Sequence, residues 1–386
     1  MEVKPIPYGK QEIIDEDIKA VVDVLKSDFL TQGPKVEEFE KKFAAYIGSK
    51  YAVTVSNGTA ALHLAALSLG VKKGSKVITS SISFVATANC IEYCGGEVDF
   101  CDIDPDTLCL DINLVREKLE NSPKGTYSGI IPVDFAGYPV QMDEIRSLAN
   151  EFDLWILEDS CHAPGGCFVD NKGVNQNCGN GSYADAAIFS FHPVKHIACG
   201  EGGMVTTNDE KVYEKLKLLR SHGITKDSNK LFSNHGSWYY EMQNLGYNYR
   251  LPDIQCALGI SQLKRATFNI EKRREIAKNY INNLNGLPIS IPKSNYFDGH
   301  AFHLFVILTD KRFELYNYLR ENKILTQIHY IPIHQMPFYK EKYGKQTLKS
   351  AEKYYENCIS LPIYPSLDNH EQDYIIDSIK SFYEEI

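Results

Sequence analysis

The sequence places one lysine, Lys195, between a short apolar strand and a glycine-rich turn, in the segment FSFHPVKHIACGEGGMVTT (189–207). A lysine at the mouth of such a site, partly removed from water, has a lowered pKa and acts as a neutral amine nucleophile toward an aldehyde. The alternative is a solvated surface lysine, the usual place for this residue. The glycines favour a site, because they allow close backbone approach that a free surface side chain would not need.

Two carboxylates, Glu158 and Asp159, end another apolar run, LWILEDSCHA (154–163). A carboxylate at the end of a buried strand is costly unless it meets a cation or hydrogen-bond donors. Asp159 would either cap the segment that follows it or form a salt bridge with a protonated pyridine nitrogen, the partner that pyridoxal phosphate supplies. The residues alone leave both interpretations open.

A phosphate-binding turn is indicated by VSNGTAAL (55–62), where a strand ends and a helix begins. The first N–H groups of a helix carry a partial positive charge and bind anions. An ordinary N-cap by Ser56, Asn57 or Thr59 explains the same residues equally well.

Phe84 lies just after a strand in SISFVATAN, where its ring could stack on a flat ligand ring. The default interpretation is an aromatic residue of the core.

Alternating strand-like and helix-like segments from about residue 50 to 210 must position these side chains. Such alternation predicts an α/β fold with a mostly parallel sheet covered by helices. Ligands of these sheets bind at the carboxyl ends of the strands. A helix is expected from about Pro252, followed by a smaller α+β region. We therefore predict a large domain over 1–250 and a small domain over 251–386.

Charge and hydropathy exclude several partners. The chain has 41 basic and 50 acidic residues, a net charge of −9, and no basic run, so nucleic acid is not expected. No apolar stretch approaches the ~20 residues of a membrane span, and the first residues lack the apolar core of a secretory signal. We expect a cytoplasmic protein without a membrane partner.

The ten cysteines predict no metal site. Cys161, Cys167 and Cys178 lie at irregular intervals around His162, unlike the tight ligand spacings of zinc sites. Reduced, mostly buried thiols are the expectation. The stretch GNGSYA (179–184) superficially matches a dinucleotide-binding fingerprint, but it follows an Asn-rich loop instead of a strand, so we reject it.

Seven ordered blocks, SNGTAAL, SFVATAN, EDSCHA, FSFHPVKHI, GEGGMV, RSHG and GYNYRLPDIQCALGISQL, together resemble the DegT/DnrJ/EryC1/StrS family of sugar-nucleotide aminotransferases. The resemblance covers nearly the whole chain. It implies the fold-type I architecture of pyridoxal phosphate enzymes and a homodimer with active sites at the subunit interface. Pyridoxal 5'-phosphate is the implied cofactor.

The resemblance also implies roles for particular residues. Lys195 matches the Schiff-base lysine that carries the cofactor, and Asp159 matches the partner of the pyridinium nitrogen. Asn248 matches an asparagine that reaches the phosphate from the neighbouring subunit. Three further residues match positions that hold the cofactor phosphate: Thr59, Ala60 and Ser190. Phe84 matches an aromatic residue that stacks on the cofactor ring, and His162 a position beside its phenolic oxygen. The candidate sugar contacts are Tyr8, Gln32 and His329.

The implied substrates are glutamate and a nucleotide-linked keto sugar. Several blocks are most similar to family members that aminate C4 of a UDP-linked 4-keto-6-deoxy-N-acetylhexosamine. D-configured 4-keto sugars and 3-keto sugars are the alternatives, and the polar stretches 170–183 and 226–243 would alter the sugar pocket. A non-catalytic sensor has no need for Lys195, and the family's dehydratases replace this lysine with histidine, so both are disfavoured.

Overall fold

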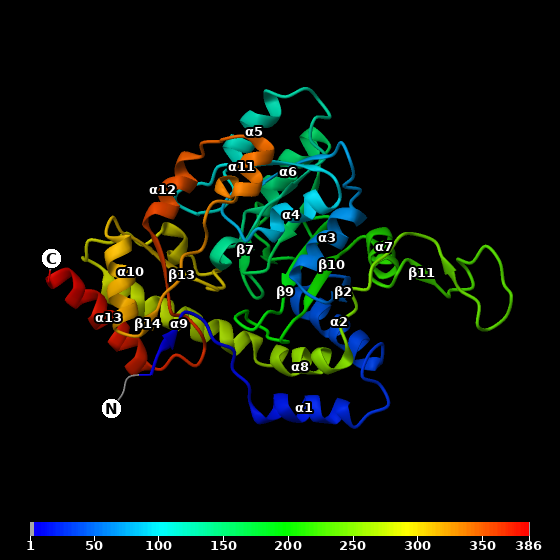
Figure 1. Cartoon of the computed structure of the whole chain (residues 1–386), viewed down its shortest axis with the longest axis horizontal. Helices are drawn as coiled ribbons and strands as arrows, with labels where there is room; N and C mark the ends of the chain where they lie inside the picture. Colours follow the sequence, from blue (N-terminus) through cyan, green and yellow to red (C-terminus); the bar gives the residue numbers. More distant parts are fainter. Residues whose placement is uncertain (1–3, 386) are drawn as a thin grey trace.

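The computed structural model describes residues 4–385 and contains a seven-stranded sheet at its centre (Figure 1). All neighbouring strands are parallel except β10, which is antiparallel to both β2 and β9. This confirms the predicted α/β class with a mostly parallel sheet. The strand order is β2 (Tyr51–Val55), β10 (Gly203–Thr207), β9 (Ala186–Ser190), β6 (Trp155–Asp159), β5 (Gly129–Ile131), β3 (Lys76–Ser80) and β4 (Glu97–Cys101).

Helices cover both faces of this sheet because its central strands are apolar on both sides. Apolar residues of three helices pack together on one face: α3 (Gly58–Ser68), α4 (Ala86–Tyr93) and α7 (Glu210–Arg220). Residues of four others pack on the opposite face: α2 (Pro34–Ile47), α5 (Ile112–Glu120), α6 (Met142–Phe152) and α8 (Asp253–Leu263). Helix α1 (Asp15–Leu25) lies against α8 (Figure 1).

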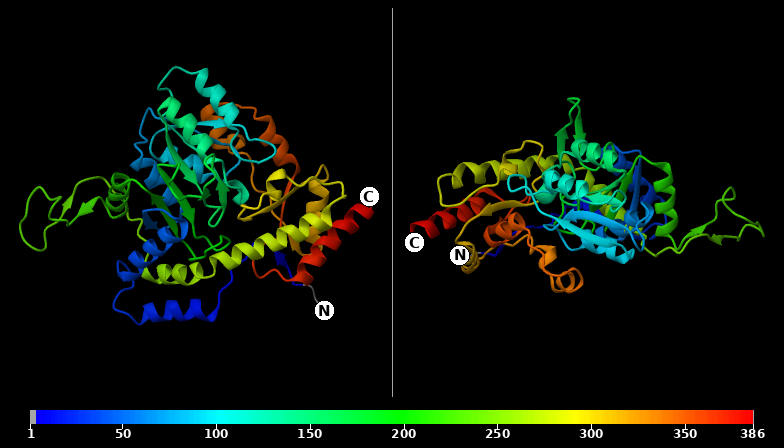
Figure 2. Two further views of the ribbon diagram at one scale, coloured as in Figure 1. Left: turned by 180° about the vertical axis from the view of Figure 1, so that it is seen from behind. Right: turned by 90° about the horizontal axis from the view of Figure 1, so that it is seen from above.

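The C-terminal region has its own apolar core, in which α9 (Ala266–Leu284) lies beside α13 (Asn369–Glu384), as Figure 2 shows. The other elements are β13 (Phe305–Leu308), α10 (Arg312–Glu321), β14 (Ile324–Leu325), α11 (Pro337–Tyr343), α12 (Lys349–Asn357) and β15 (Cys358–Leu361). The N-terminal strand β1 (Ile6–Pro7) pairs with β14, and Tyr339 of α11 packs among residues of α3 and α4. The division at residue 250 stays a prediction.

One strand of the C-terminal region is shorter than the apolar run in which it lies. The run 301–308 forms β13 only from Phe305, because residues 301–304 turn toward the large sheet. Ala301 N–H donates to the Gly137 carbonyl at 2.8 Å and Leu304 N–H to the Ala136 carbonyl at 3.1 Å. Phe302 has a left-handed backbone with φ 46°. These contacts bring the C-terminal region to the carboxyl ends of the central strands.

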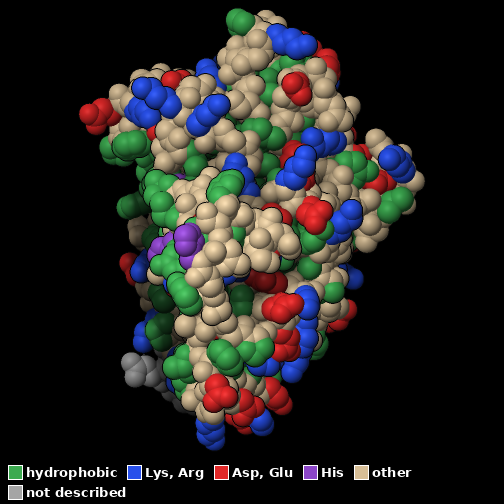
Figure 3. Space-filling view, turned by 90° about the vertical axis from the view of Figure 1, so that its right-hand side faces the viewer, with side chains coloured by type: hydrophobic (Ala, Val, Ile, Leu, Met, Phe, Trp, Pro, Cys, Tyr) green, Lys and Arg blue, Asp and Glu red, His purple; other side chains and the backbone are tan. Residues whose placement is uncertain are grey.

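A long arm leaves the body after α7 and carries the two-residue strands β11 (Ile224–Thr225) and β12 (Glu241–Met242) (Figures 1 and 2). Its tip exposes large apolar side chains: Phe232 is 89% exposed and Trp238 is 73% exposed. Basic and acidic side chains are interspersed on the face from which the arm projects (Figure 3). Within residues 4–385, no helix combines the length and apolar character needed to span a membrane.

Candidate active site

A cavity of about 430 Å³ opens at the carboxyl ends of β6 and β9. Eight of the predicted site residues line it: Tyr8, Thr59, Phe84, Asp159, His162, Ser190, Lys195 and His329. Ala60 lies one residue beyond this lining, in the first turn of α3. The structure therefore brings together residues from segments more than 300 positions apart, as expected for a site at the strand ends.

Lys195 follows β9 and presents its amine to the cavity wall. The surrounding packing lowers the pKa of Lys195 to about 8, chiefly because burial disfavours the charged amine. The negative charge of Asp159 opposes this shift in pKa, and the Arg273 guanidinium adds to it. A large fraction of the amine is thus neutral near pH 8, the form that attacks an aldehyde.

Asp159 ends β6 and is 4% exposed. Its Oδ2 accepts a hydrogen bond from Thr87 Oγ1 at 2.7 Å, and its Oδ1 accepts one from Cys161 N–H at 3.2 Å. The second contact is the local cap considered from the sequence. These uncharged donors fix the carboxylate at the cavity without neutralising it, which suits a cationic ring nitrogen.

The start of α3 lies close to the end of β9. Asn57 is the N-cap residue, since its side chain accepts from Ala60 N–H at 2.8 Å, so Thr59 is not used as the cap. A Cβ on Gly58 would lie 3.0 Å from Ser190 Cβ, so glycine permits this close approach. An 11-residue helix whose first turn faces a serine hydroxyl provides the donor set for a phosphate group.

His162 is fixed by two contacts and stays neutral. Its Nδ1 accepts from Ala136 N–H at 3.2 Å, which leaves the proton on Nε2, and Nε2 lies 3.3 Å from the Tyr330 hydroxyl. Burial and the nearby Lys195 hold the pKa of His162 well below its usual value. Phe84 is 57% exposed at the cavity, 6.2 Å from the Tyr330 ring.

Gln32 and Asn248 lie outside this cavity. Gln32 lines a second cavity of about 450 Å³ together with Arg220, Ser221 and Arg250. Asn248 is joined to the same region by its backbone bridge to Ser221. Within one chain the structure thus separates these two residues from Lys195, although it places them near each other.

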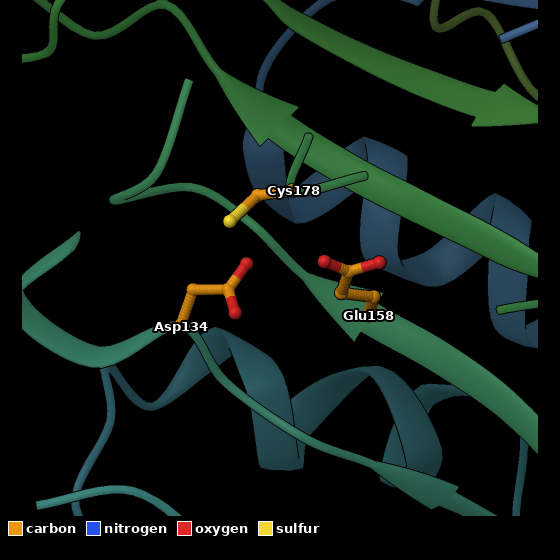
Figure 4. A group of neighbouring side chains, drawn as sticks. All are labelled: Asp134, Glu158 and Cys178. Carbon is orange, nitrogen blue, oxygen red and sulfur yellow. The ribbon is translucent and has the colours of Figure 1, made fainter. Parts of the chain in front are cut away.

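Beneath Asp159, on the opposite side of β6, three buried side chains point toward one another: Asp134, Glu158 and Cys178 (Figure 4). Asp134 accepts from Val140 N–H and Ser160 Oγ, and Glu158 accepts from Gly179 N–H. Burial raises the pKa of Asp134 to about 6 and that of Glu158 well above its usual value. One oxygen of each carboxyl group lies within 4.8 Å of the other, and the charge of Asp134 adds to the raised pKa of Glu158.

Four residues that line the cavity were not selected as site residues from the sequence: Thr87, Cys161, His303 and Tyr330. Tyr330 directly follows His329, so the IHY triplet was the available signal. Among residues 4–385 all ten cysteines are free, seven of them buried. This confirms the expectation of reduced, mostly buried thiols.

Comparison with known proteins shows the family. The model of the DegT/DnrJ/EryC1/StrS aminotransferase family matches residues 11–380. A spore coat polysaccharide biosynthesis protein, SpsC of Bacillus subtilis, is 38% identical over 97% of this chain and 96% of its own. A UDP-4-amino-4,6-dideoxy-N-acetyl-beta-L-altrosamine transaminase of Campylobacter jejuni is 37% identical over 99% of this chain and 98% of its own.

Solved structures agree with these sequence matches. PseC of Helicobacter pylori, an aminotransferase of pseudaminic acid biosynthesis, superposes with a TM-score of 0.88 at 34% identity, covering 99% of this chain and 100% of its own. The fold is therefore that of fold-type I aminotransferases, as the resemblance implied. The lysine, the buried carboxylate and the helix start fit pyridoxal phosphate. The chain belongs to the DegT/DnrJ/EryC1/StrS aminotransferase family and is a pyridoxal phosphate-dependent sugar aminotransferase.

Proposed function

We propose that the protein transfers the amino group of glutamate to C4 of a UDP-linked 4-keto-6-deoxy-N-acetylhexosamine of L-altro configuration. The observation that carries this proposal is similarity over the whole chain to the Campylobacter jejuni transaminase, together with the superposition on PseC. The first relative is named as a UDP-4-amino-4,6-dideoxy-N-acetyl-beta-L-altrosamine transaminase, and the second as an aminotransferase of pseudaminic acid biosynthesis. The product would be UDP-4-amino-4,6-dideoxy-N-acetyl-β-L-altrosamine.

Lys195 has two tasks in this proposal. Its amine would hold the cofactor covalently, and when free it would carry a proton to and from the α-carbon of the amino acid. The depressed pKa of Lys195, about 8, suits both tasks, because the group accepts and releases a proton near neutral pH. The bound cofactor supplies the electron sink.

The other residues bind and orient the cofactor. The Asp159 carboxylate would hold the ring nitrogen protonated, which favours electron withdrawal. Thr59, Ala60 and Ser190 would hold the phosphate at the start of α3, where Gly58 and Ser190 lie close together. The neutral His162 would bind the phenolic oxygen, and the exposed Phe84 would cover the ring.

A homodimer completes the site in this proposal. Asn248 would reach the cofactor phosphate of the partner, since within its own chain it lies outside the cavity of Lys195. Gln32, in the same region, would reach the partner's sugar pocket. The exposed Phe232 and Trp238 on the arm support the proposal, because large exposed apolar side chains are typical of surfaces that another chain covers.

The sugar is the least constrained part of the proposal. SpsC and the altrosamine transaminase are 38% and 37% identical, so identity does not rank their substrates. D-configured 4-keto sugars and 3-keto sugars remain alternatives. Tyr8 and His329 are candidate sugar contacts, since their rings lie 5.0 Å apart at the cavity.

Two measurements test the proposal. Borohydride reduction of the holoenzyme followed by peptide mapping should place the pyridoxyl group on Lys195, and another lysine would contradict this role. Release of 2-oxoglutarate that depends on sugar separates an aminotransferase from a sensor or a dehydratase.

A third measurement tests the sugar. The L-altro and D-xylo 4-keto epimers should be compared side by side by kcat/KM. A tenfold preference for the D-xylo epimer, ~1.4 kcal/mol in transition-state free energy, would overturn the sugar assignment and leave the transaminase intact.

A further inference from the structure

We propose that His303 is a positioning residue that accepts a hydrogen bond from the Lys195 amine and fixes its direction in the active site. The proposal rests on Lys195 being the lysine that carries the cofactor. It concerns the free amine, the form in which Lys195 must move a proton.

The contact itself is direct. Nε2 of His303 lies 3.3 Å from Nζ of Lys195, and among residues 4–385 it is the one side-chain atom hydrogen-bonded to this amine. His303 is 5% exposed and lines the same cavity. Its ring lies 4.3 Å from the His162 ring, which limits its rotation.

The protonation states define the direction of the bond. Burial, followed by the charge of Lys195, holds the pKa of His303 well below its usual value, so the imidazole is neutral. An ammonium group has donors only, so Nε2 is the acceptor when Lys195 is charged. Nδ1 of His303 has no hydrogen-bond partner among the described residues, so the Lys195 amine alone sets the tautomer.

The backbone around His303 is held from two sides. Nη1 of Arg273, a residue of α9 that is 1% exposed, donates to the carbonyls of Phe302 at 3.0 Å and His303 at 3.4 Å. On the other side, a Cβ on Gly137 would lie 2.9 Å from Phe302 N and 3.0 Å from His303 N, so only glycine admits this approach. The left-handed φ of 46° at Phe302 is strained for a side chain of this size. Strain that the surroundings enforce in this way is typical of functional sites.

A fixed acceptor has a clear use for a catalytic lysine. The side chain has four rotatable bonds and about 2 kcal/mol of rotamer entropy, so a freed amine would otherwise sample many directions. A hydrogen bond to the immobilised His303 ring selects the directions that keep Nζ close to the reacting atoms. Other ionisable groups also face this amine and influence its proton affinity without bonding to it: Asp159, Cys161, His162, His196, Arg273 and His329.

The variants His303→Leu and His303→Gln test the inference. Leucine removes the acceptor, whereas the glutamine carbonyl oxygen lies near the place of Nε2. His196→Leu is the matched control: His196 is buried, its ring lies 5.7 Å from the His303 ring, and its Nε2 contacts the Ala301 carbonyl instead of Lys195. It removes a neighbouring imidazole and leaves the Lys195 contact in place.

The first readout uses the cofactor-free full-length protein. The pH dependence of Lys195 acetylation by brief acetic anhydride pulses, measured by peptide mass spectrometry, gives the pKa of the amine. Loss of a hydrogen bond to the charged form should lower this pKa by about one unit in His303→Leu, which makes labelling at pH 7 about fivefold faster. In His303→Gln the pKa of Lys195 should stay within about 0.3 unit of that in the parent. In His196→Leu the pKa of Lys195 should not fall as it does in His303→Leu.

The second readout is the single-turnover rate of the holoenzyme with glutamate. We expect a decrease of tenfold or more in His303→Leu with little change in glutamate affinity, and recovery to within about threefold in His303→Gln. Equal losses of single-turnover rate in His303→Leu and His303→Gln would overturn the inference. So would a shift in the Lys195 pKa in His196→Leu as large as that in His303→Leu. If the leucine variant does not fold, His303→Asn replaces it, because its shorter side chain withdraws the acceptor from Nζ.

Borohydride mapping of the same holoenzymes tests the role of Lys195 separately from the role of His303. A pyridoxyl group on another lysine would refute the role of Lys195. A pyridoxyl group on Lys195 combined with unchanged pKa and rates in the His303 variants would refute the role of His303 alone.

Discussion

The carboxyl pair beneath the active site predicts an unusual dependence of stability on pH, which the variant Glu158→Gln should remove. Glu158 and Asp134 are both buried with oxygens within 4.8 Å of each other, and the hydrogen bonds they accept come from neutral donors. A glutamine amide reproduces the protonated state of Glu158: its N–H₂ donates to Asp134, and its oxygen accepts from Gly179 N–H. The variant therefore keeps the shape of the buried cluster in Figure 4 and removes one titrating carboxyl group.

The raised pKa values determine whether stability rises or falls with pH. Unfolded carboxyl groups titrate near pH 4, whereas in the folded protein the pKa of Asp134 is about 6 and that of Glu158 is higher than usual. Above about pH 4 the folded state binds more protons, so the stabilisation is fully present at lower pH and is lost as pH rises through the folded pKa. For each additional proton that the folded state binds, the free energy of unfolding falls by ~1.4 kcal/mol per pH unit as pH rises, or by at most ~2.7 kcal/mol between pH 5 and 7.

Denaturant titrations at pH 5, 6, 7 and 8, with equal protein and saturating cofactor, measure this effect as the difference between variant and parent. We expect Glu158→Gln to gain about 1 to 3 kcal/mol in the free energy of unfolding relative to the parent between pH 5 and 7. Asp134→Asn is the control, because it loses acceptor capacity and should be destabilised by about 2 kcal/mol at every pH. Parallel pH profiles for Glu158→Gln and the parent would refute the raised pKa of Glu158.

Three further predictions concern the cofactor site. Asp159→Asn removes a buried charge while keeping the shape, so cofactor affinity and the glutamate half-reaction should fall by a factor of about 30 to 1,000; values within threefold of the parent, by fluorescence titration and stopped flow, would contradict the assignment. Mixing inactive Lys195→Ala and Asn248→Ala chains should restore some activity in heterodimers, and no rescue under proven subunit exchange would count against a shared site. Gly58→Ala places a Cβ 3.0 Å from Ser190 Cβ, which should weaken cofactor binding about tenfold in equilibrium dialysis while the free energy of unfolding changes little.

The order of strands, turns and helices was determined by the sequence, because hydrophobic periodicity and glycine-rich turns are local properties. Parallel strands deliver their last residues to one edge, so Asp159, Ser190 and Lys195 were predicted to meet before the fold was known. The N-cap ambiguity at α3 was not resolvable in this way. Only the structure shows that Asn57 is the cap and that Thr59 remains in the cavity lining.

Long-range contacts were decided by the tertiary structure alone. The run 301–308 has the composition of a strand, yet its first residues turn toward Gly137 and place His303 against Lys195. Glu158 precedes Asp159 in the same strand, and their opposite directions make one residue part of the cavity and the other part of a buried carboxyl pair. A sequence specifies which side chains leave a strand end, but what each one meets depends on how distant segments pack against it.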